Sequence, residues 1–185
     1  MVVISGPGGV GKDFLISRLL EDNPNLRYSV SYTTRPKRAY EEDGKHYTFV
    51  SEQEFRSLVA QGEFLEHATI NGYLYGTSED RVEQLQRQGH DVILKIDVKG
   101  AENVRRRRPD GVLIFVAPPS MEELMRRRLE RGTETPEVIE ARQRLAEVEM
   151  SFADRYDYVV VNDDAERALK EIEETLRRER EKRRR

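Results

Sequence analysis

The sequence contains no cysteine, which excludes disulfide bonds and thiolate metal sites and fits a reducing compartment. It has no apolar run near the ~18 residues that a membrane-spanning helix needs, and Met1 leads directly into an apolar segment with no signal peptide. It also has little excess charge of either sign. Its net charge is −3, so a general affinity for nucleic acid is not expected. We therefore expect a cytoplasmic protein without a membrane or nucleic-acid partner.

Charged residues of both signs are abundant. They make up 36% of the 185 residues, and hydrophobic residues make up 37%, which indicates a highly charged surface around a core of ordinary size. A chain of this length suits a single domain, 1–185. The C-terminal arginine run, 183–185, is interpreted as the frayed end of a helix rather than as a nucleic-acid patch.

Segments with the continuous hydrophobicity of buried parallel strands alternate along the chain with segments of helical periodicity. The expected strands of this type cover 2–4, 91–97, 111–116 and 158–161, and a strand of alternating polarity is expected over 26–32. The expected helices cover about 12–22, 100–108, 121–131, 136–153 and 165–182. This alternation predicts an α/β fold, with a parallel sheet as its core and helices on both faces of the sheet.

The segment 32–80 interrupts that alternation with short amphipathic strands and a hairpin turn at Asn71-Gly72. Ser51 and Glu54 form the pattern of a capping box, which predicts a helix from residue 52 to residue 61. We therefore predict a small mixed α/β subdomain with its own sheet, inserted after the first strand and helix of the core.

A glycine-rich segment joins the first expected strand to the first expected helix with the Gly-x4-Gly-Lys spacing of a P-loop. Its residues are Gly6, Pro7, Gly8, Gly9, Val10, Gly11, Lys12 and Asp13. The glycines let the backbone turn tightly and aim its N–H groups into one concave nest, to which the helix adds its positive N-terminal end. Lys12 supplies a cation for β- and γ-phosphate oxygens. The flanking strand and helix favour a nucleotide-phosphate site over a turn with no such role.

Seven further motifs are spread along the chain. They are SYTTRPKR at 31–38, GKHYTFVS at 44–51, GEFLE at 62–66, YGT at 75–77, IDVKGA at 96–101, RGTET at 131–135 and YDYVVVNDD at 156–164. In their order and spacing they closely resemble the guanylate kinase family. Each motif is weak alone, but the ordered set covers essentially the whole chain.

The resemblance implies a nucleoside-monophosphate kinase that transfers the γ-phosphoryl group of ATP to GMP with Mg²⁺, giving ADP and GDP. It also implies three parts: a core over 1–31, 81–119 and 154–185, a GMP-binding insertion over 32–80, and a helical lid over about 120–153. Asn162 is a candidate for contacting adenine. The oligomeric state stays open between monomer and homodimer.

Matching positions imply the roles of individual residues. The GMP phosphate would be held by Ser31, Arg35, Arg38, Tyr47 and Tyr75, and guanine would be read by Glu66, Thr77 and Asp97. Guanidinium forks suit phosphate, and carboxylates accept the two adjacent donors of guanine, N1–H and the exocyclic amine. The catalytic cations would be Lys12 and the lid arginines Arg127, Arg131 and Arg142.

Three positions depart from the family pattern. Asp13 stands where the family usually has a serine or threonine that holds Mg²⁺, and Lys95 stands where it usually has an acidic residue. We hypothesise that Asp13 pairs with Lys95, which leaves Mg²⁺ to ATP oxygens and water. Alternatively Asp13 binds Mg²⁺ through water while Lys95 contacts phosphate, or the two changes are unrelated. Arg128 stands where the family usually has leucine, so the arginine run 126–128 is ambiguous by one residue.

Two other functions remain open at this stage. The Gly-Lys-Asp ending of the P-loop resembles the ribose 1,5-bisphosphate phosphokinases, which lack the 43–50 loop and the two guanine carboxylates. The fold also occurs as a non-catalytic module that binds phosphoproteins, but such modules usually have a degraded P-loop, whereas Lys12 and its glycines are intact here.

Overall fold

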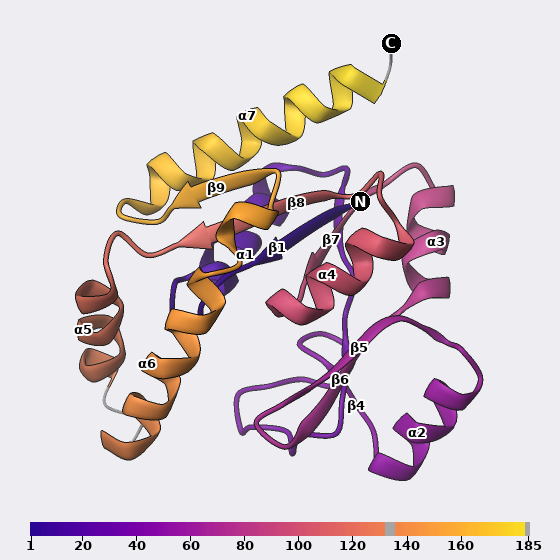
Figure 1. The fold of residues 1–185 in the computed structure, drawn as a ribbon. Coiled ribbons are helices and arrows are strands. Elements are labelled where there is room, and N and C mark those ends of the chain that lie inside the picture. The colour runs from indigo at the N-terminus through magenta and orange to yellow at the C-terminus, as the bar shows by residue number, and fades with distance from the viewer. Residues whose placement is uncertain (132–135, 184–185) are drawn as a thin grey trace. The chain divides into compact units, whose positions relative to one another are not determined.

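The computed structural model describes residues 1–131 and 136–183. The strands are β1 Val2–Ser5, β2 Leu26–Tyr28, β3 Tyr32–Thr33, β4 Thr48–Phe49, β5 Phe64–Ile70, β6 Tyr73–Ser78, β7 Asp91–Lys95, β8 Val112–Ala117 and β9 Tyr158–Val161. The helices are α1 Lys12–Asp22, α2 Glu52–Ala60, α3 Glu79–Arg87, α4 Val98–Arg107, α5 Met121–Arg131, α6 Pro136–Met150 and α7 Ala165–Arg183, with a short 3₁₀ turn at Ala153–Arg155 (Figure 1).

The fold is α/β, as predicted, with a five-stranded sheet in the order β2-β7-β1-β8-β9. β2 runs parallel to β7, and β8 runs parallel to β9. The central strands are the continuous apolar runs of the sequence, and every residue of β1 and β8 is buried. Strands covered on both faces require this composition, because each side chain meets a helix or the core.

The chain forms two compact units, which are described separately. The first unit comprises residues 1–2 and 25–111, and the second comprises residues 3–24 and the described part of 112–185. The first unit holds a second sheet with the strand order β4-β3-β6-β5. Its hairpin, β5 with β6, closes through Asn71 and Gly72, whose φ angles of 50° and 81° are those of a type I′ turn.

One strand prediction was wrong. The segment predicted as a single strand over 26–32 is divided between two sheets, because β2 ends at Tyr28 and β3 begins at Tyr32. The Arg81 guanidinium holds the chain at the point of departure. Its Nη1 donates to Val30 O at 2.8 Å, and its Nη2 donates to the Tyr32 hydroxyl at 3.0 Å. The alternating polarity of 26–32 contains no information about contacts with Arg81, which lies 49 residues after Tyr32 in the sequence.

In the second unit, α1 packs against α7, and α5 packs against α6. The core between α1, α7 and the sheet is formed by fully buried aliphatic side chains such as Leu15, Leu19 and Ile172. α6 ends at Met150, three residues before the predicted boundary, and the chain continues as the turn Ala153–Arg155.

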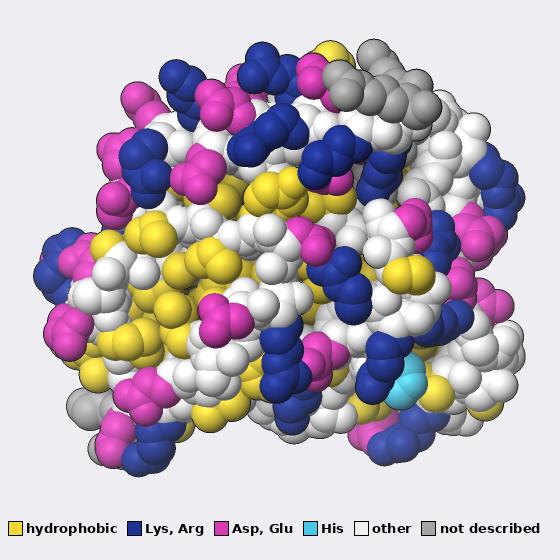
Figure 2. Space-filling model, turned by 45° about the horizontal axis from the view of Figure 1, so that its top comes forward, with side chains coloured by type: hydrophobic (Ala, Val, Ile, Leu, Met, Phe, Trp, Pro, Cys, Tyr) yellow, Lys and Arg dark blue, Asp and Glu magenta, His cyan; other side chains and the backbone are white. Residues whose placement is uncertain are grey.

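The surface carries charges of both signs close together. Figure 2 shows lysine, arginine, aspartate and glutamate side chains interspersed over the face that it presents, with hydrophobic side chains between them. Many of these charges pair along one helix, such as Arg56 with Glu52 in α2 and Arg144 with Glu140 in α6. Among the described residues, no helix is both long and apolar enough to cross a membrane.

Candidate active site

The P-loop lies between β1 and α1, as predicted, and its shape depends on glycine. Gly6 has a φ of 136°, and a Cβ at this position would lie 2.1 Å from Val116 O. Any side chain at this position would therefore force β1 and β8 apart. The loop then closes a tight turn in which Val10 N donates to Pro7 O at 3.3 Å.

Lys12 bends back over this loop. Its Nζ donates to Gly6 O at 2.6 Å and to Pro7 O at 2.9 Å. Lys12 is the first residue of α1, and its ammonium group is therefore held beside the backbone at the start of the loop that precedes this helix. Both the lysine and the helix N-terminus bring positive charge to the same place, which favours a phosphate group.

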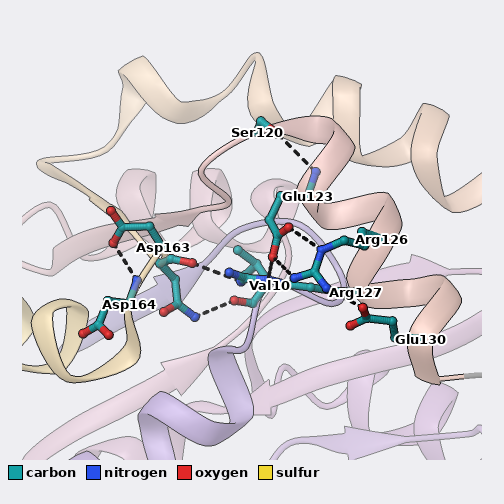
Figure 3. A network of polar contacts seen from close by, with 9 residues as sticks. Val10, Ser120, Glu123, Arg126, Arg127, Glu130, Asp163 and Asp164 are labelled. Carbon is teal, nitrogen blue, oxygen red and sulfur yellow. Dashed lines mark hydrogen bonds and ion pairs between the residues drawn. The ribbon is translucent and has the colours of Figure 1, made fainter.

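Arg127 is the predicted lid arginine that contacts the P-loop network (Figure 3). Its Nε donates to Glu123 Oε1 at 2.8 Å, and its Nη1 donates to Asn162 O at 3.0 Å. Hydrogen bonds from Arg126 and Arg127 lower the pKa of Glu123 to about 2, so this carboxylate stays ionised. The Asn162 side chain in turn donates to Val10 O at 2.7 Å, so the residue proposed as an adenine contact anchors the P-loop.

The other predicted lid arginines are less informative. Arg142 lies partly buried on α6. Arg131 is the last residue of α5, and its side chain lies outside the described residues, as does most of the 131–135 motif. Sequence reasoning noted Arg128 only as a departure from the family pattern and gave it no role; this residue is 4% exposed and lies against Gly8 of the P-loop.

The first unit holds a cluster of cationic and phenolic groups, formed by predicted phosphate-binding residues. The Arg35 guanidinium lies 5.5 Å from the centre of the Tyr47 ring. The rings of Tyr47 and Tyr75 meet edge to face at 5.9 Å. Ser31 is buried, and it immediately precedes β3 in the sequence. The structure thus brings Arg35, Tyr47 and Tyr75 together.

Glu41 organises the two arginines of this cluster, and sequence reasoning did not single it out. Arg35 Nη2 donates to its Oε1 at 2.6 Å, and the Arg38 backbone N–H donates to its Oε2 at 2.8 Å. Burial raises the pKa of Glu41, but the bonds from Arg35 and Arg38 outweigh burial and hold that pKa below its usual value. The Arg38 side chain reaches the Tyr40 hydroxyl at 2.8 Å. The sequence signal that could have identified Glu41 is its position a few residues after Arg35 and Arg38.

Two carboxylates of this unit, Glu66 and Asp97, lie beside Gly100. Glu66 Oε1 accepts from the Thr77 hydroxyl at 2.6 Å, and Asp97 Oδ1 accepts from Gly100 N at 2.8 Å. A methyl group placed on Gly100 would lie 2.6 Å from Glu66 Oε2 and 3.0 Å from Asp97 Oδ1, so both carboxylates flank one small space. A register shift between Phe64 and Glu66 in β5 sets Glu66 opposite Thr77.

Burial changes the ionisation of both acids. It raises the pKa of Glu66 to about 7, with a further contribution from the charge of Asp97. It also raises the pKa of Asp97. A buried and a half-buried acceptor at one place suit a ligand that presents adjacent N–H donors, because such donors would offset the cost of ionising both groups.

Asp13 and Lys95, the two departures that are predicted to pair, belong to different units. Lys95 ends β7, with its Nζ 5.5 Å from the centre of the Tyr47 ring. Asp13 is an exposed residue in the first turn of α1. The proposed pairing of Asp13 with Lys95 stays a prediction.

Comparisons with known proteins agree with the resemblance. The family model described as guanylate kinase matches residues 1–179. The guanylate kinase of Alkalilimnicola ehrlichii is 49% identical over 173 residues, which cover 94% of this chain and 85% of that protein. The chain belongs to the guanylate kinase family.

Further relatives extend this match. A guanylate kinase of Clostridium perfringens is 46% identical, over 95% of this chain and 82% of that protein. The crystal structure of guanylate kinase from Anaplasma phagocytophilum superposes with a TM-score of 0.81 at 37% identity, and covers 97% of this chain and 85% of that chain. The fold of this guanylate kinase family member is therefore the fold of its relatives, and the family settles the class of the enzyme as a nucleoside-monophosphate kinase.

Proposed function

We propose that this chain catalyses the transfer of the γ-phosphoryl group of ATP to GMP, giving ADP and GDP. The observation that carries the proposal is the pair of carboxylates at Gly100, buried Glu66 and half-buried Asp97, which is suited to guanine, in a chain that also has an intact P-loop. Membership of the guanylate kinase family supports the same reaction.

The second unit binds ATP in this proposal. Phosphoryl transfer depends mainly on positioning and on neutralising the charge of the transferring group. The P-loop, 6–13, supplies backbone N–H groups, and Lys12 exchanges its carbonyl partners for β- and γ-phosphate oxygens. Arg127, Arg131 and Arg142 are the cations of the lid. No protein nucleophile is required, because a phosphate oxygen of GMP attacks the γ-phosphorus directly.

The first unit binds GMP. Arg35, Arg38, Tyr47, Tyr75 and Ser31 hold its phosphate. The support is the proximity of Arg35 to the two tyrosines and the Glu41 carboxylate that fixes its guanidinium. Guanidinium groups bind phosphate through two parallel hydrogen bonds, and their binding is strongest when they are held in one orientation.

Guanine binds between Glu66 and Asp97, with Thr77 beside them. Its N1–H and exocyclic amine donate to the carboxylates, which become fully ionised in the complex. Adenine presents an acceptor at N1, so AMP would leave a buried carboxylate without a donor. Discrimination against AMP should therefore be large.

The oxygen donors of the chain fit Mg²⁺. Asp13 presents an exposed carboxylate in the first turn of α1, next to Lys12. Mg²⁺ commonly keeps several waters and binds through one or two carboxylates plus substrate phosphates, so one carboxylate is sufficient. No group of three or more potential ligands lies together in the described part of the chain. Asp13 would hold Mg²⁺, directly or through water, and the ion supplies neutralisation of the β- and γ-phosphate charge.

The remaining assignments complete the proposal. We assign residues 32–80 to the GMP-binding insertion, about 120–153 to the lid, and 1–31, 81–119 and 154–185 to the core. We assign the reaction to the cytoplasm, and it needs no nucleic-acid or membrane partner. One chain carries every residue named above, so the proposal holds for a monomer or a homodimer.

A coupled assay of ADP release tests this function. With Mg-ATP, we expect rapid turnover with GMP and at least ~100-fold lower kcat/KM with AMP. Turnover with ribose 1,5-bisphosphate instead of GMP would identify the chain as a ribose 1,5-bisphosphate phosphokinase. An absence of turnover, with GMP binding retained, would indicate a binding module.

A further inference from the structure

The P-loop is held from outside by a buried arginine. Arg128 Nη2 donates to Gly8 O at 2.5 Å, and its Nε donates to the same oxygen at 3.1 Å. The side chain is 4% exposed and comes from α5, 120 residues away in sequence. Two hydrogen bonds from one guanidinium fix both the position and the direction of this carbonyl.

Arg128 is itself held by a second residue. Its Nη1 donates to Gln143 Oε1 at 3.1 Å, and Gln143 Nε2 donates to Met121 O at 3.1 Å. Gln143 belongs to α6, and Met121 is the first residue of α5. The guanidinium is therefore fixed by both helices, which are the elements assigned to the lid.

The peptide between Gly8 and Gly9 is the one that needs such support. Two adjacent glycines accept either orientation of the peptide plane between them at little cost, because neither has a Cβ. Gly9 has a φ of 92°, and a Cβ there would lie 3.3 Å from Arg128 Nε. Because a trans peptide is planar, holding Gly8 O toward Arg128 turns the Gly9 N–H to the opposite side.

We propose that Arg128, fixed by Gln143, is a positioning residue that orients the Gly8–Gly9 peptide of the P-loop for binding the phosphates of ATP. The guanidinium charge also polarises that peptide and strengthens its N–H as a donor. Arg128 does not contact ATP itself. This inference rests on the proposed function, and it links the lid helices to the phosphate cradle.

Binding measurements separate this role from others. Calorimetric titrations with ATP, inorganic tripolyphosphate and GMP are compared for the wild type, Arg128→Met, Arg128→Lys and Gln143→Leu. Methionine preserves the packing of the stem beside Gly9 and removes the guanidinium. Arg144→Leu is the matched control, because Arg144 lies exposed on α6 and bonds only to Glu140 among the contacts described.

Arg128→Met should weaken ATP and tripolyphosphate binding equally, by about tenfold, and leave GMP binding unchanged. Arg128→Lys and Gln143→Leu should weaken ATP binding by about threefold, and Arg144→Leu should not change it. KM for ATP should rise in parallel, with kcat little changed.

Unchanged ATP affinity in Arg128→Met would overturn the inference, and so would a fall in kcat of ~100-fold with KM for ATP unchanged, which would place the guanidinium on the transferring group. If Arg128→Met does not fold, unchanged ATP binding in both Arg128→Lys and Gln143→Leu overturns it. The proposed function fails separately, if the wild type binds ATP but does not phosphorylate GMP.

Discussion

In the proposed reaction the two units bind their ligands in different ways. In the second unit the groups proposed to bind ATP include the backbone amides of the P-loop as well as Lys12, and side chains such as Asn162 and Arg128 hold the loop by its carbonyls. In the first unit the groups proposed to bind GMP are side chains, and two of them are held by other side chains, Arg35 by Glu41 and Glu66 by Thr77. The backbone cradle suits any polyphosphate, whereas paired side chains can distinguish one base from another. The first unit should therefore determine the specificity for GMP, whereas the second unit should accept different polyphosphates.

The most severe test of this division is Lys12→Ala. Because Lys12 neutralises the transferring phosphate, its loss should lower kcat by at least ~10³-fold. GMP affinity, measured by calorimetry, should stay within about twofold of the wild type. A comparable loss of GMP binding would show that the two functions are not divided between the units.

Glu66→Gln should have the next largest effect, and only on the first unit. The amide cannot accept from both donors of guanine in the same way, so GMP affinity should fall about 100-fold. Tripolyphosphate binding should not change. Glu63→Gln, on the exposed residue that precedes β5, is the control. A wild-type affinity for GMP in Glu66→Gln would remove Glu66 from the guanine pocket.

Glu41→Gln sharpens the comparison by testing a supporting residue. Loss of the charge that fixes Arg35 should raise KM for GMP about tenfold, with KM for ATP unchanged. The control is Glu42→Gln, whose exposed carboxylate bonds to Lys45. A lower KM for GMP would instead mean that Glu41 competes with the GMP phosphate for Arg35.

The smallest effect is a dependence on pH that arises from Glu66. Its pKa is raised from 4.5 to about 7 by burial, so the folded chain binds more protons than the unfolded chain between these values. Its contribution to the free energy of unfolding is therefore fully present below pH 4.5 and decreases as the pH rises through about 7. Because the complex needs the ionised form, GMP affinity should rise over the same interval.

Denaturant titrations of the ligand-free protein between pH 4.5 and 8 would measure this dependence, and Glu66→Gln should remove the part due to this group. If the difference between the two proteins is constant across that range, Glu66 is not the titrating residue. Titrations with GMP at the same pH values give the second readout.

Local patterns predicted most of the fold. The P-loop follows from the spacing of its glycines, and the core strands follow from short apolar runs such as 112–117, which is buried at every position. The turn at Asn71 and the capping box of Ser51 and Glu54 were predicted because their chemistry lies within four residues. The strand predicted over 26–32 failed because its course depends on Arg81, which is distant in sequence.

The same limit applies to the candidate site. Sequence reasoning found Arg35 through a family motif, but it did not find Glu41, which holds the Arg35 guanidinium. Arg128 was noted only as a departure, because the carbonyl that it binds lies 120 residues away. Supporting residues are visible only once the fold brings their partners together.

The two carbonyl partners of Lys12 have a consequence for the pace of the reaction cycle. The ammonium group donates hydrogen bonds to Gly6 O and Pro7 O at 2.6 and 2.9 Å. The free energy that Lys12 contributes to nucleotide binding is therefore the difference between its hydrogen bonds to phosphate and its hydrogen bonds to these two carbonyls. When the transferred group has gone, the lysine can leave the spent nucleotide without becoming an isolated charge. In the proposed reaction, the loop that binds ATP would therefore also ease the release of ADP.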